Sequence, residues 1–200
     1  MASTERLRIG LDFDGTLANT MGAAEAYLRE VEGIVLAPHE LTWPPGIKQL
    51  GRERFEQMLV DERFIEQLEF VPGALGVARS LMADADIFLV TARNEWQTEP
   101  VQRWLEGHGL RFEGVASTSY ESKAGACREL RLDVHFDDML AHTADVMEQT
   151  DTILALLSAP WNELSPAIGD HSQNRPHVHA NWHDFHDWTR QTYGERLRPR

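Results

Sequence analysis

The sequence predicts an α/β protein whose parallel sheet has helices on both faces, and two patterns carry that prediction. Five short apolar runs have the length of strands, and helical patterns separate them along the chain. Strands that alternate with helices in this way pair in parallel and are covered on both sides. The expected strands are residues 8–13, 86–91, 112–116, 133–136 and 152–157. The expected helices between them are residues 73–82, 99–108, 123–130 and 141–149.

A third observation is the long connection between the first two strands. It holds no convincing strand, only helical stretches at residues 22–31 and 52–68 around the turn Trp43-Pro44-Pro45-Gly46. A connection of this length inside a compact domain usually has a function. The predicted division is a core of residues 1–16 and 73–200, with a small helical cap of residues 17–72 inserted after the first strand.

Length and composition indicate one domain with an insertion. The chain has 200 residues and a net charge of −13, which argues against binding to nucleic-acid polymers or anionic membranes. No apolar run is long enough to span a membrane, and residues 1–8 lack an apolar signal-peptide core. The one cysteine, Cys127, fits a reducing compartment, so we expect a cytoplasmic protein in which Cys127 is a small buried side chain.

The first predicted strand ends in two carboxylates, Asp12 and Asp14, followed by Gly15. Strand side chains alternate, so Asp12 and Asp14 share a side while Phe13 points to the other. Two anionic groups at the end of a buried strand are costly unless a cation or a proton lies between them. The alternative is a solvated acidic turn, since Asp and Gly are ordinary turn residues.

Polar residues also stand at the ends of other predicted strands, where parallel sheets bind their ligands. Lys123 opens a predicted helix, and a cation is disfavoured there by the helix dipole, which favours a functional lysine over a solvated one. These residues are Thr91, Ala92 and Arg93 after the second strand, Lys123 before the fourth, and Asp137 and Asp138 after the fourth.

Taken together and in this order, the motifs resemble those of the haloacid dehalogenase superfamily, and the match runs from Asp12 to Asp138. The resemblance implies a Rossmann-like core with a cap. It implies a phosphatase in which Asp12 is the nucleophile that forms an aspartyl-phosphate and Asp14 is the general acid and base. Dehalogenases of this superfamily lack the second carboxylate, so Asp14 favours a phosphate ester as substrate.

The same resemblance implies how phosphate and metal would be held. Phosphate would be bound by Thr91, Ala92, Arg93 and Lys123. The implied Mg²⁺ ligands are Asp12, the backbone carbonyl of Asp14, and Asp138, with Asp137 as the alternative to Asp138. Oxygen ligands of this kind are those that Mg²⁺ prefers.

Four outer stretches narrow the resemblance to the cytosolic and mitochondrial 5′(3′)-deoxyribonucleotidases and their bacterial relatives. They are Val71-Pro72-Gly73-Ala74, Phe136-Asp137-Asp138, Ala159-Pro160-Trp161-Asn162 and Val178-His179-Ala180-Asn181-Trp182. The implied substrate is a nucleoside or deoxynucleoside monophosphate. The pair Ala92-Arg93 departs from the family pattern, and the cap has no clear aromatic box. The candidates for base stacking are Trp43, Phe55, Phe64 and Phe70, although such residues more often belong to a core.

Other interpretations stay open. The enzyme could act on a sugar phosphate or another small metabolite, or the chain could be a catalytically silent relative that binds a phosphorylated ligand or a partner protein. A phosphonatase is disfavoured, because nothing around Lys48, the lysine of the predicted cap, suggests desolvation. Five histidines between His171 and His186 could form a transition-metal site, but we expect surface histidines there. The oligomeric state is open.

Overall fold

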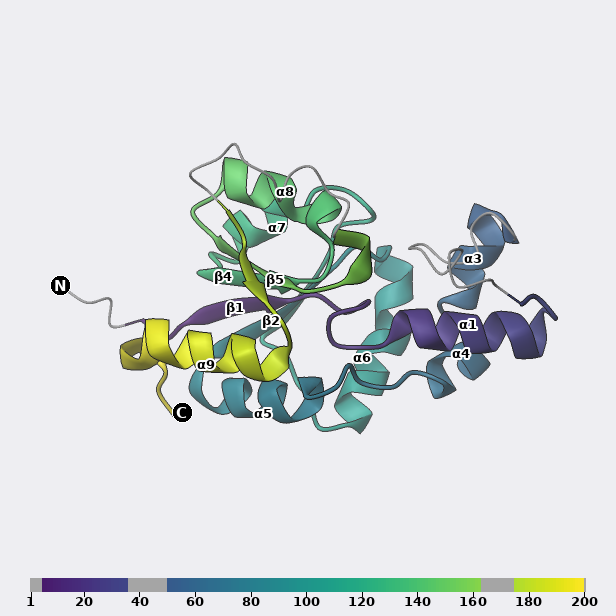
Figure 1. The fold of residues 1–200 in the computed structure, drawn as a ribbon, viewed down its shortest axis with the longest axis horizontal. Coiled ribbons are helices and arrows are strands. Elements are labelled where there is room, and N and C mark those ends of the chain that lie inside the picture. The colour runs from purple at the N-terminus through teal and green to yellow at the C-terminus, as the bar shows by residue number, and fades with distance from the viewer. Residues whose placement is uncertain (1–4, 36–49, 163–174, 200) are drawn as a thin grey trace.

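The computed structural model describes residues 5–35, 50–162 and 175–199, and its centre is a six-stranded parallel sheet between two layers of helices (Figure 1). The strand order is β3-β2-β1-β4-β5-β6, and every pairing is parallel. The strands are β1 (Arg8–Leu11), β2 (Asp86–Thr91), β3 (Gly114–Ser117), β4 (Val134–Asp137), β5 (Ile153–Leu157) and β6 (His177–His179).

The predicted α/β class and parallel sheet are confirmed, but the predicted number of five strands is wrong. The sixth strand, β6, has three residues and pairs with β5 at the edge of the sheet. His177 and Val178 are exposed there, so the segment lacks the apolar run that marks a buried strand. Several strand bounds also differ from those expected, and among them β1 ends at Leu11, before the first carboxylate, and β4 includes Asp137.

Helices cover both faces of the sheet (Figure 1). One face packs against α5 (Ala74–Asp84), α6 (Thr98–Gly107) and α9 (Trp182–Tyr193), and the other against α7 (Ala124–Glu129) and α8 (Leu140–Gln149). The side chains of β2 divide between two apolar clusters, with Leu89 in one and Val90 in the other, as strand alternation requires. Cys127 lies in the second cluster and is fully buried, as expected.

Among the described residues between β1 and α5, three helices stand together beyond the end of β1 (Figure 1). They are α1 (Thr20–Val31), α3 (Arg52–Met58) and α4 (Glu62–Glu66), and we call them the inserted helices. The helical stretch expected over residues 52–68 consists of two helices, α3 and α4, because the chain turns between them. The Asp61 side chain caps α4 by accepting from the backbone N–H of Arg63 at 2.9 Å, which favours a helix start at that point.

Short 3₁₀ helices complete the described chain at Glu95–Gln97, Pro160–Asn162 and Gly194–Arg196. None of the helices in the described ranges is both long and apolar enough to cross a membrane. The predicted turn at Trp43, the cap lysine Lys48 and His171 lie outside the described residues.

Candidate active site

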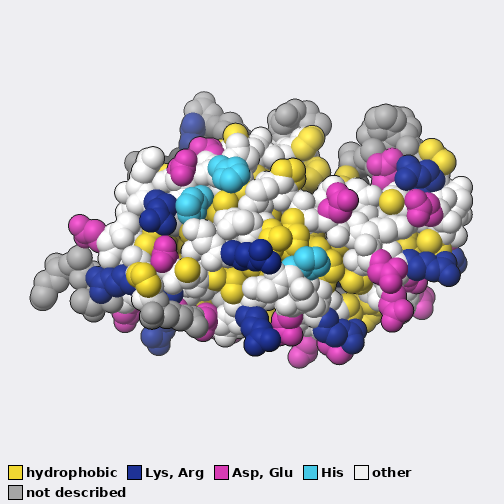
Figure 2. All heavy atoms as spheres, turned by 90° about the horizontal axis from the view of Figure 1, so that it is seen from below, with side chains coloured by type: hydrophobic (Ala, Val, Ile, Leu, Met, Phe, Trp, Pro, Cys, Tyr) yellow, Lys and Arg dark blue, Asp and Glu magenta, His cyan; other side chains and the backbone are white. Residues whose placement is uncertain are grey.

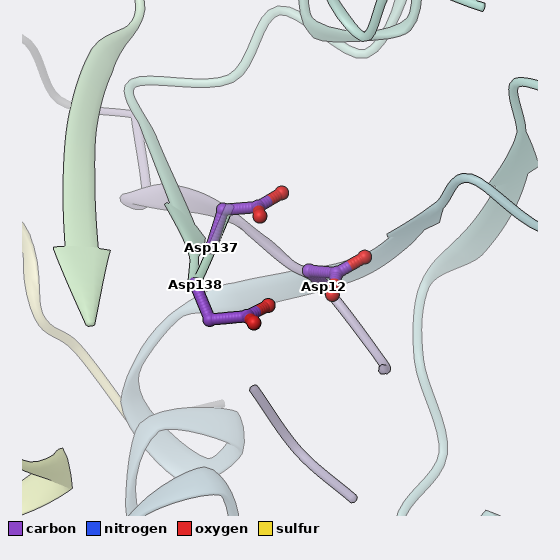
Figure 3. Close-up of side chains that lie close together, drawn as sticks. All are labelled: Asp12, Asp137 and Asp138. Carbon is purple, nitrogen blue, oxygen red and sulfur yellow. The ribbon is translucent and has the colours of Figure 1, made fainter. Parts of the chain in front are cut away.

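Three carboxylates meet at the carboxyl ends of the central strands (Figure 3). The pairing of Leu11 with Phe136 brings the ends of β1 and β4 together, and the backbone N–H of Asp12 donates to the Phe136 carbonyl at 2.9 Å. One oxygen from each of Asp12, Asp137 and Asp138 lies within 4.8 Å of the others, and all three residues are buried. The sheet register alone therefore places these predicted residues side by side.

Lys123, at the N-terminal end of α7, connects two of these carboxylates. Its Nζ donates to Asp12 Oδ1 and to Asp137 Oδ2, at 2.5 Å in each case. Burial by itself lowers the pKa of a lysine, but here the two carboxylates outweigh burial and raise the pKa of Lys123. The lysine is therefore a fixed positive charge, 1% exposed, between the strand ends.

Asp137 accepts three hydrogen bonds from the protein. His135 Nε2 donates to Asp137 Oδ2 at 2.9 Å, beside the Lys123 ammonium, and the backbone N–H of Met139 donates to Oδ1 at 2.8 Å. Burial raises the pKa of Asp137, but Lys123 and His135 outweigh it and hold that pKa well below the ordinary range. Asp137 is a carboxylate that positions its neighbours.

Asp12 and Asp138 are the two carboxylates of the cluster whose pKa values are raised. Burial raises the pKa of Asp12 to about 7 against the opposing effect of Lys123. Burial, with Asp137 and Asp12 as further causes, raises the pKa of Asp138 well above its ordinary value. Three buried carboxylates against one lysine leave an excess of negative charge, and an oxygen-rich site with such an excess fits a divalent cation.

The turn after β1 brings the backbone against Asp138. Gly15 has a φ of +83°, in the region that favours glycine, and a β-carbon there would collide with the Asp138 carboxylate. The next residue, Thr16, donates its hydroxyl to Asp138 Oδ1 at 3.0 Å. Gly15 is therefore required twice, for the turn and for the close approach.

Asp14 lies across the site and is held by Arg93. Arg93 Nε donates to Asp14 Oδ2 at 2.9 Å and Nη2 donates to Oδ1 at 2.8 Å, while Thr20 Oγ1 donates to the same Oδ1 at 2.7 Å. Arg93 Nη1 also donates to the backbone carbonyl of Leu59, just after α3, at 2.9 Å. The buried Thr91 hydroxyl accepts the backbone N–H of Arg93 at 3.2 Å.

Most of these residues line a cavity with a volume of about 30 Å³. Thr91 is buried and does not line it. The structure brings the other predicted site residues together around this cavity. The role of each residue stays a prediction. The lining residues are Asp12, Asp14, Leu59, Ala92, Arg93, Tyr120, Lys123, Asp137, Asp138 and Met139.

The residues at the site that were missed from the sequence include His135, Tyr120 and Leu59. His135 had a usable signal, because it shares a strand face with Asp137 two residues later. Tyr120 had no such signal. It reaches the cavity from a loop in which Ser119 and Tyr120 both have positive φ, 51° and 64°, and neither residue type predicts that conformation. Leu59 lies just beyond α3 and reaches the cavity through tertiary packing alone.

Side chains of two outer stretches, residues 159–162 and 178–182, hydrogen-bond to the backbone of the loops that follow β1 and β4. Trp161 Nε1 and Asn162 Nδ2 both donate to the backbone carbonyl of Asp138, at 2.9 and 2.6 Å. Trp182 Nε1 donates to the backbone carbonyl of Thr16 at 2.8 Å. These side chains fix the two turns that carry Asp138 and its hydroxyl partner.

The cap aromatics that the structure describes do not line the cavity. Phe55 is 2% exposed and Phe64 is fully buried, both in the main apolar cluster. Phe70 packs on Trp104 with ring centroids 4.4 Å apart. The hypothesis of base stacking by these three phenylalanines is therefore wrong for this structure, because Phe55 and Phe64 are buried in the main apolar cluster and Phe70 packs on Trp104.

The expectation of surface histidines is wrong for His179. It is 4% exposed and lies among the rings of Phe136, Phe185 and Trp188. His177 and His183 are exposed, as expected. Among the described residues, the acidic cluster of Figure 3 is the one group of three or more side chains close enough to share a metal ion, so the histidines form no such group there.

The fold is that of hydrolases in the haloacid dehalogenase superfamily, as solved structures of low sequence identity show. One is a putative phosphoglycolate phosphatase from Lactobacillus plantarum, with 18% identity and a TM-score of 0.63, covering 92% of this chain and 99% of that one. Another is a haloacid dehalogenase-like hydrolase from Streptococcus pneumoniae, with 16% identity and a TM-score of 0.60, covering 93% and 99%.

A third is a putative hydrolase of the same superfamily from Bacillus subtilis, bound to magnesium. Its identity is 11% and its TM-score 0.62, and the comparison covers 92% of this chain and 98% of that one. No family model and no curated protein matches the chain. At these identities the comparisons show the fold alone.

Proposed function

We propose that this chain is a Mg²⁺-dependent phosphomonoesterase that acts on a small phosphorylated metabolite, such as a sugar phosphate, through an aspartyl-phosphate on Asp12. The observation that carries the proposal is the buried cluster of Asp12, Asp138 and Lys123 facing Asp14 across one cavity. A nucleophile, a fixed cation, a metal-binding carboxylate and a second carboxylate are the components that phosphoryl transfer requires.

In the first step, an Asp12 oxygen bonds to phosphorus while the bond from phosphorus to the ester oxygen breaks, and Asp14 gives its proton to that leaving oxygen. In the second step, water bonds to phosphorus, the bond to Asp12 breaks, and Asp14 takes the proton of the water. Lys123 donates to Asp12 Oδ1, so it orients the nucleophile and offsets the phosphate charge.

Asp12 and Asp138 are the side chains proposed to hold Mg²⁺, together with the backbone carbonyl of Asp14. Asp138 is favoured over Asp137, because Asp137 already accepts from Lys123, His135 and Met139, whereas Asp138 accepts from one side chain, Thr16. When bound, the cation would offset charge on the phosphate oxygens and on the carboxylates. A Bacillus subtilis neighbour of the same fold has magnesium bound, which agrees with this choice of metal.

The cavity favours a small substrate over a nucleotide. Its volume of about 30 Å³ is well below the range for ligand sites, which leaves little room for anything larger than a small group. Tyr120 is the aromatic residue among the lining residues, and the Arg52 guanidinium lies 5.9 Å from its ring centroid, so one ring face is already approached. Proteins of the same fold that are described as putative or predicted phosphoglycolate phosphatases also point to small phosphorylated substrates.

We further propose that residues 17–72 act as the cap of this site. Leu59 follows α3, lines the cavity and accepts a hydrogen bond from Arg93 through its carbonyl. A segment in this position can exclude water from the reacting groups and select the leaving group by its shape.

The test is a phosphate-release screen with purified protein and Mg²⁺. Sugar phosphates, small phosphorylated hydroxy acids, nucleoside monophosphates and 4-nitrophenyl phosphate are compared by kcat/KM, with Asp12→Asn protein from the same purification as the control. We expect the highest kcat/KM among the small metabolites and no turnover in excess EDTA.

Two results would contradict the proposal in different ways. A kcat/KM highest for nucleoside monophosphates would restore the nucleotidase interpretation. Wild-type protein that binds phosphorylated compounds in the calorimeter but releases no phosphate would instead favour the catalytically silent relative.

A further inference from the structure

Arg93 is the most heavily engaged cation of the cavity. Its side chain is 1% exposed, and each of its three nitrogens donates to a protein oxygen: Nε and Nη2 to the two oxygens of Asp14, and Nη1 to the carbonyl of Leu59. Its guanidinium also lies over the Phe13 ring, 5.0 Å from the centroid. A planar fork that is held on three sides and on one face has one orientation.

The partners of this fork belong to parts of the chain that are far apart in sequence. Asp14 follows β1, Arg93 follows β2, and Leu59 follows α3 of the inserted helices. The backbone on the Arg93 side is fixed as well, because Ser117 Oγ donates to the Arg93 carbonyl at 2.6 Å and the Arg93 N–H donates to Thr91. The orientation of Asp14 therefore depends on contacts with both the sheet and the inserted segment.

We propose that Arg93 is a positioning residue for Asp14 rather than a ligand of the phosphate, and that it transmits the position of the inserted segment to the acid–base carboxylate. This inference rests on the proposed phosphatase function, in which Asp14 protonates the leaving oxygen. Lys123 already supplies the cation beside the nucleophile. The bidentate pair with Asp14 occupies Nε and Nη2 of Arg93, the edge of the guanidinium that could otherwise bind two oxygens of a phosphate.

The proposal is tested by the dependence of the rate on the leaving group. The alkoxide of an alkyl phosphate is a poor leaving group and needs the proton of Asp14. The nitrophenolate of 4-nitrophenyl phosphate leaves readily without that proton. Proton donation by a positioned side chain is worth about 10²–10⁴ in rate. We expect Arg93→Lys, which keeps the charge but loses the fork, to lower kcat/KM by about 10²-fold for the alkyl phosphate and by less than about tenfold for the aryl phosphate.

Two further measurements separate positioning from phosphate binding. The inhibition constant of inorganic phosphate should be unchanged in Arg93→Lys and in Arg93→Met, since neither variant loses a phosphate contact. In the Asp14→Asn background, Arg93→Met should cause no additional loss with the alkyl phosphate, because a residue that acts through another shows full coupling in a double-mutant cycle. The control is Arg79→Met, since Arg79 donates to the His108 carbonyl at an exposed site.

Several outcomes would overturn the proposal. Equal losses for alkyl and aryl phosphate with a weaker inhibition by phosphate would make Arg93 a phosphate ligand. An Arg93→Lys variant as active as the wild type on the alkyl phosphate would show that the fork is not needed, and this variant decides the question even where Arg93→Met fails to fold. Wild-type protein without phosphatase activity would overturn the proposed function itself, whereas an active wild type with unselective variants overturns the Arg93 proposal alone.

Discussion

The carboxyl edge of the sheet and the inserted helices bury opposite kinds of side chain. At the sheet edge, Asp12, Lys123 and Asp137 are each at most 4% exposed and depend on one another for their hydrogen bonds. In the inserted helices the buried residues are mostly apolar, and they include aromatic rings such as Phe64, which is in edge-to-face contact with Tyr27. Their charged side chains of both signs lie at the surface, as the right-hand end of Figure 2 shows.

This difference means that the inserted helices contribute to stability, whereas the sheet edge holds the groups that could react. Burying a charged group costs free energy even when it is paired, so the sheet edge keeps its charges at the expense of stability. Burying an aromatic ring is favourable and has no chemical use of its own. Substitutions at the sheet edge should therefore change rates more than stability, and substitutions in the inserted helices should do the reverse.

The largest effect is expected for Asp12→Asn. An amide cannot form the acyl phosphate, so turnover should fall by at least about 10⁴-fold, on the scale seen when a nucleophile is removed from an enzyme. The fold should persist, because Asp137 still pairs with Lys123. Steady-state rates on 4-nitrophenyl phosphate beside a melting curve measure both quantities. Wild-type turnover by the folded variant would refute covalent catalysis at this residue.

The next effect is the reverse case, in the inserted helices. Phe64→Ala should lower the free energy of unfolding by about 3–5 kcal/mol, because the ring is fully buried and a cavity would remain. The ratio of kcat/KM values for a nucleotide and an aryl phosphate should not change, since Phe64 does not line the cavity. Val35→Ala, at a side chain 78% exposed, is the control. A selective loss with nucleotides would return Phe64 to the substrate site.

The same difference explains what could be predicted from the sequence. The positions of Asp12 and Asp138 were predictable because a parallel sheet must bring the carboxyl ends of its strands to one edge, whatever the detailed packing. A motif residue at a strand end is therefore placed by topology. His135 could have been found from strand alternation with Asp137, but its hydrogen bond needed the structure.

The inserted helices offered no such constraint. An aromatic residue on a short helix has the same pattern whether it faces a ligand or a neighbouring helix, so Phe55 and Phe64 could not be assigned from spacing. The partners of Arg93 were also unpredictable, because Asp14 and the Leu59 carbonyl meet it only through tertiary packing. The strand β6 was missed because three residues at a sheet edge carry too little apolar pattern.

A smaller effect should link metal binding to protons. Burial raises the pKa of Asp12 from 3.8 to about 7, so between about pH 4 and pH 7 the folded, metal-free protein holds a proton that the unfolded chain has released. Stability of the metal-free protein should therefore fall as pH rises through this window. Mg²⁺ requires the carboxylate, so its binding should release more protons at pH 6 than at pH 8.

Two measurements check this linkage. Calorimetric Mg²⁺ titrations in two buffers of different ionisation enthalpy report the number of protons released, and melting curves from pH 4 to pH 8 report the stability. The Asp12→Asn variant should show a flatter dependence of stability on pH. A wild-type stability that rises steadily across this window would contradict the raised pKa of Asp12.

The smallest effect should come from the side chains that donate to the backbone carbonyl of Asp138. Trp161→Phe keeps the ring but removes the Nε1–H that donates to the Asp138 carbonyl, while Asn162 still donates to the same oxygen. Groups that orient metal ligands change metal affinity by about 10–100-fold, and with one of two donors retained we expect about tenfold or less. At saturating Mg²⁺, kcat should equal that of the wild type, because Asp12, Asp14 and Lys123 keep their contacts. Trp96→Phe, at a side chain 50% exposed, controls for the loss of an indole. An equal loss of Mg²⁺ affinity in both variants, or a lower kcat at saturating Mg²⁺, would show that Trp161 does not act by holding Asp138 in place.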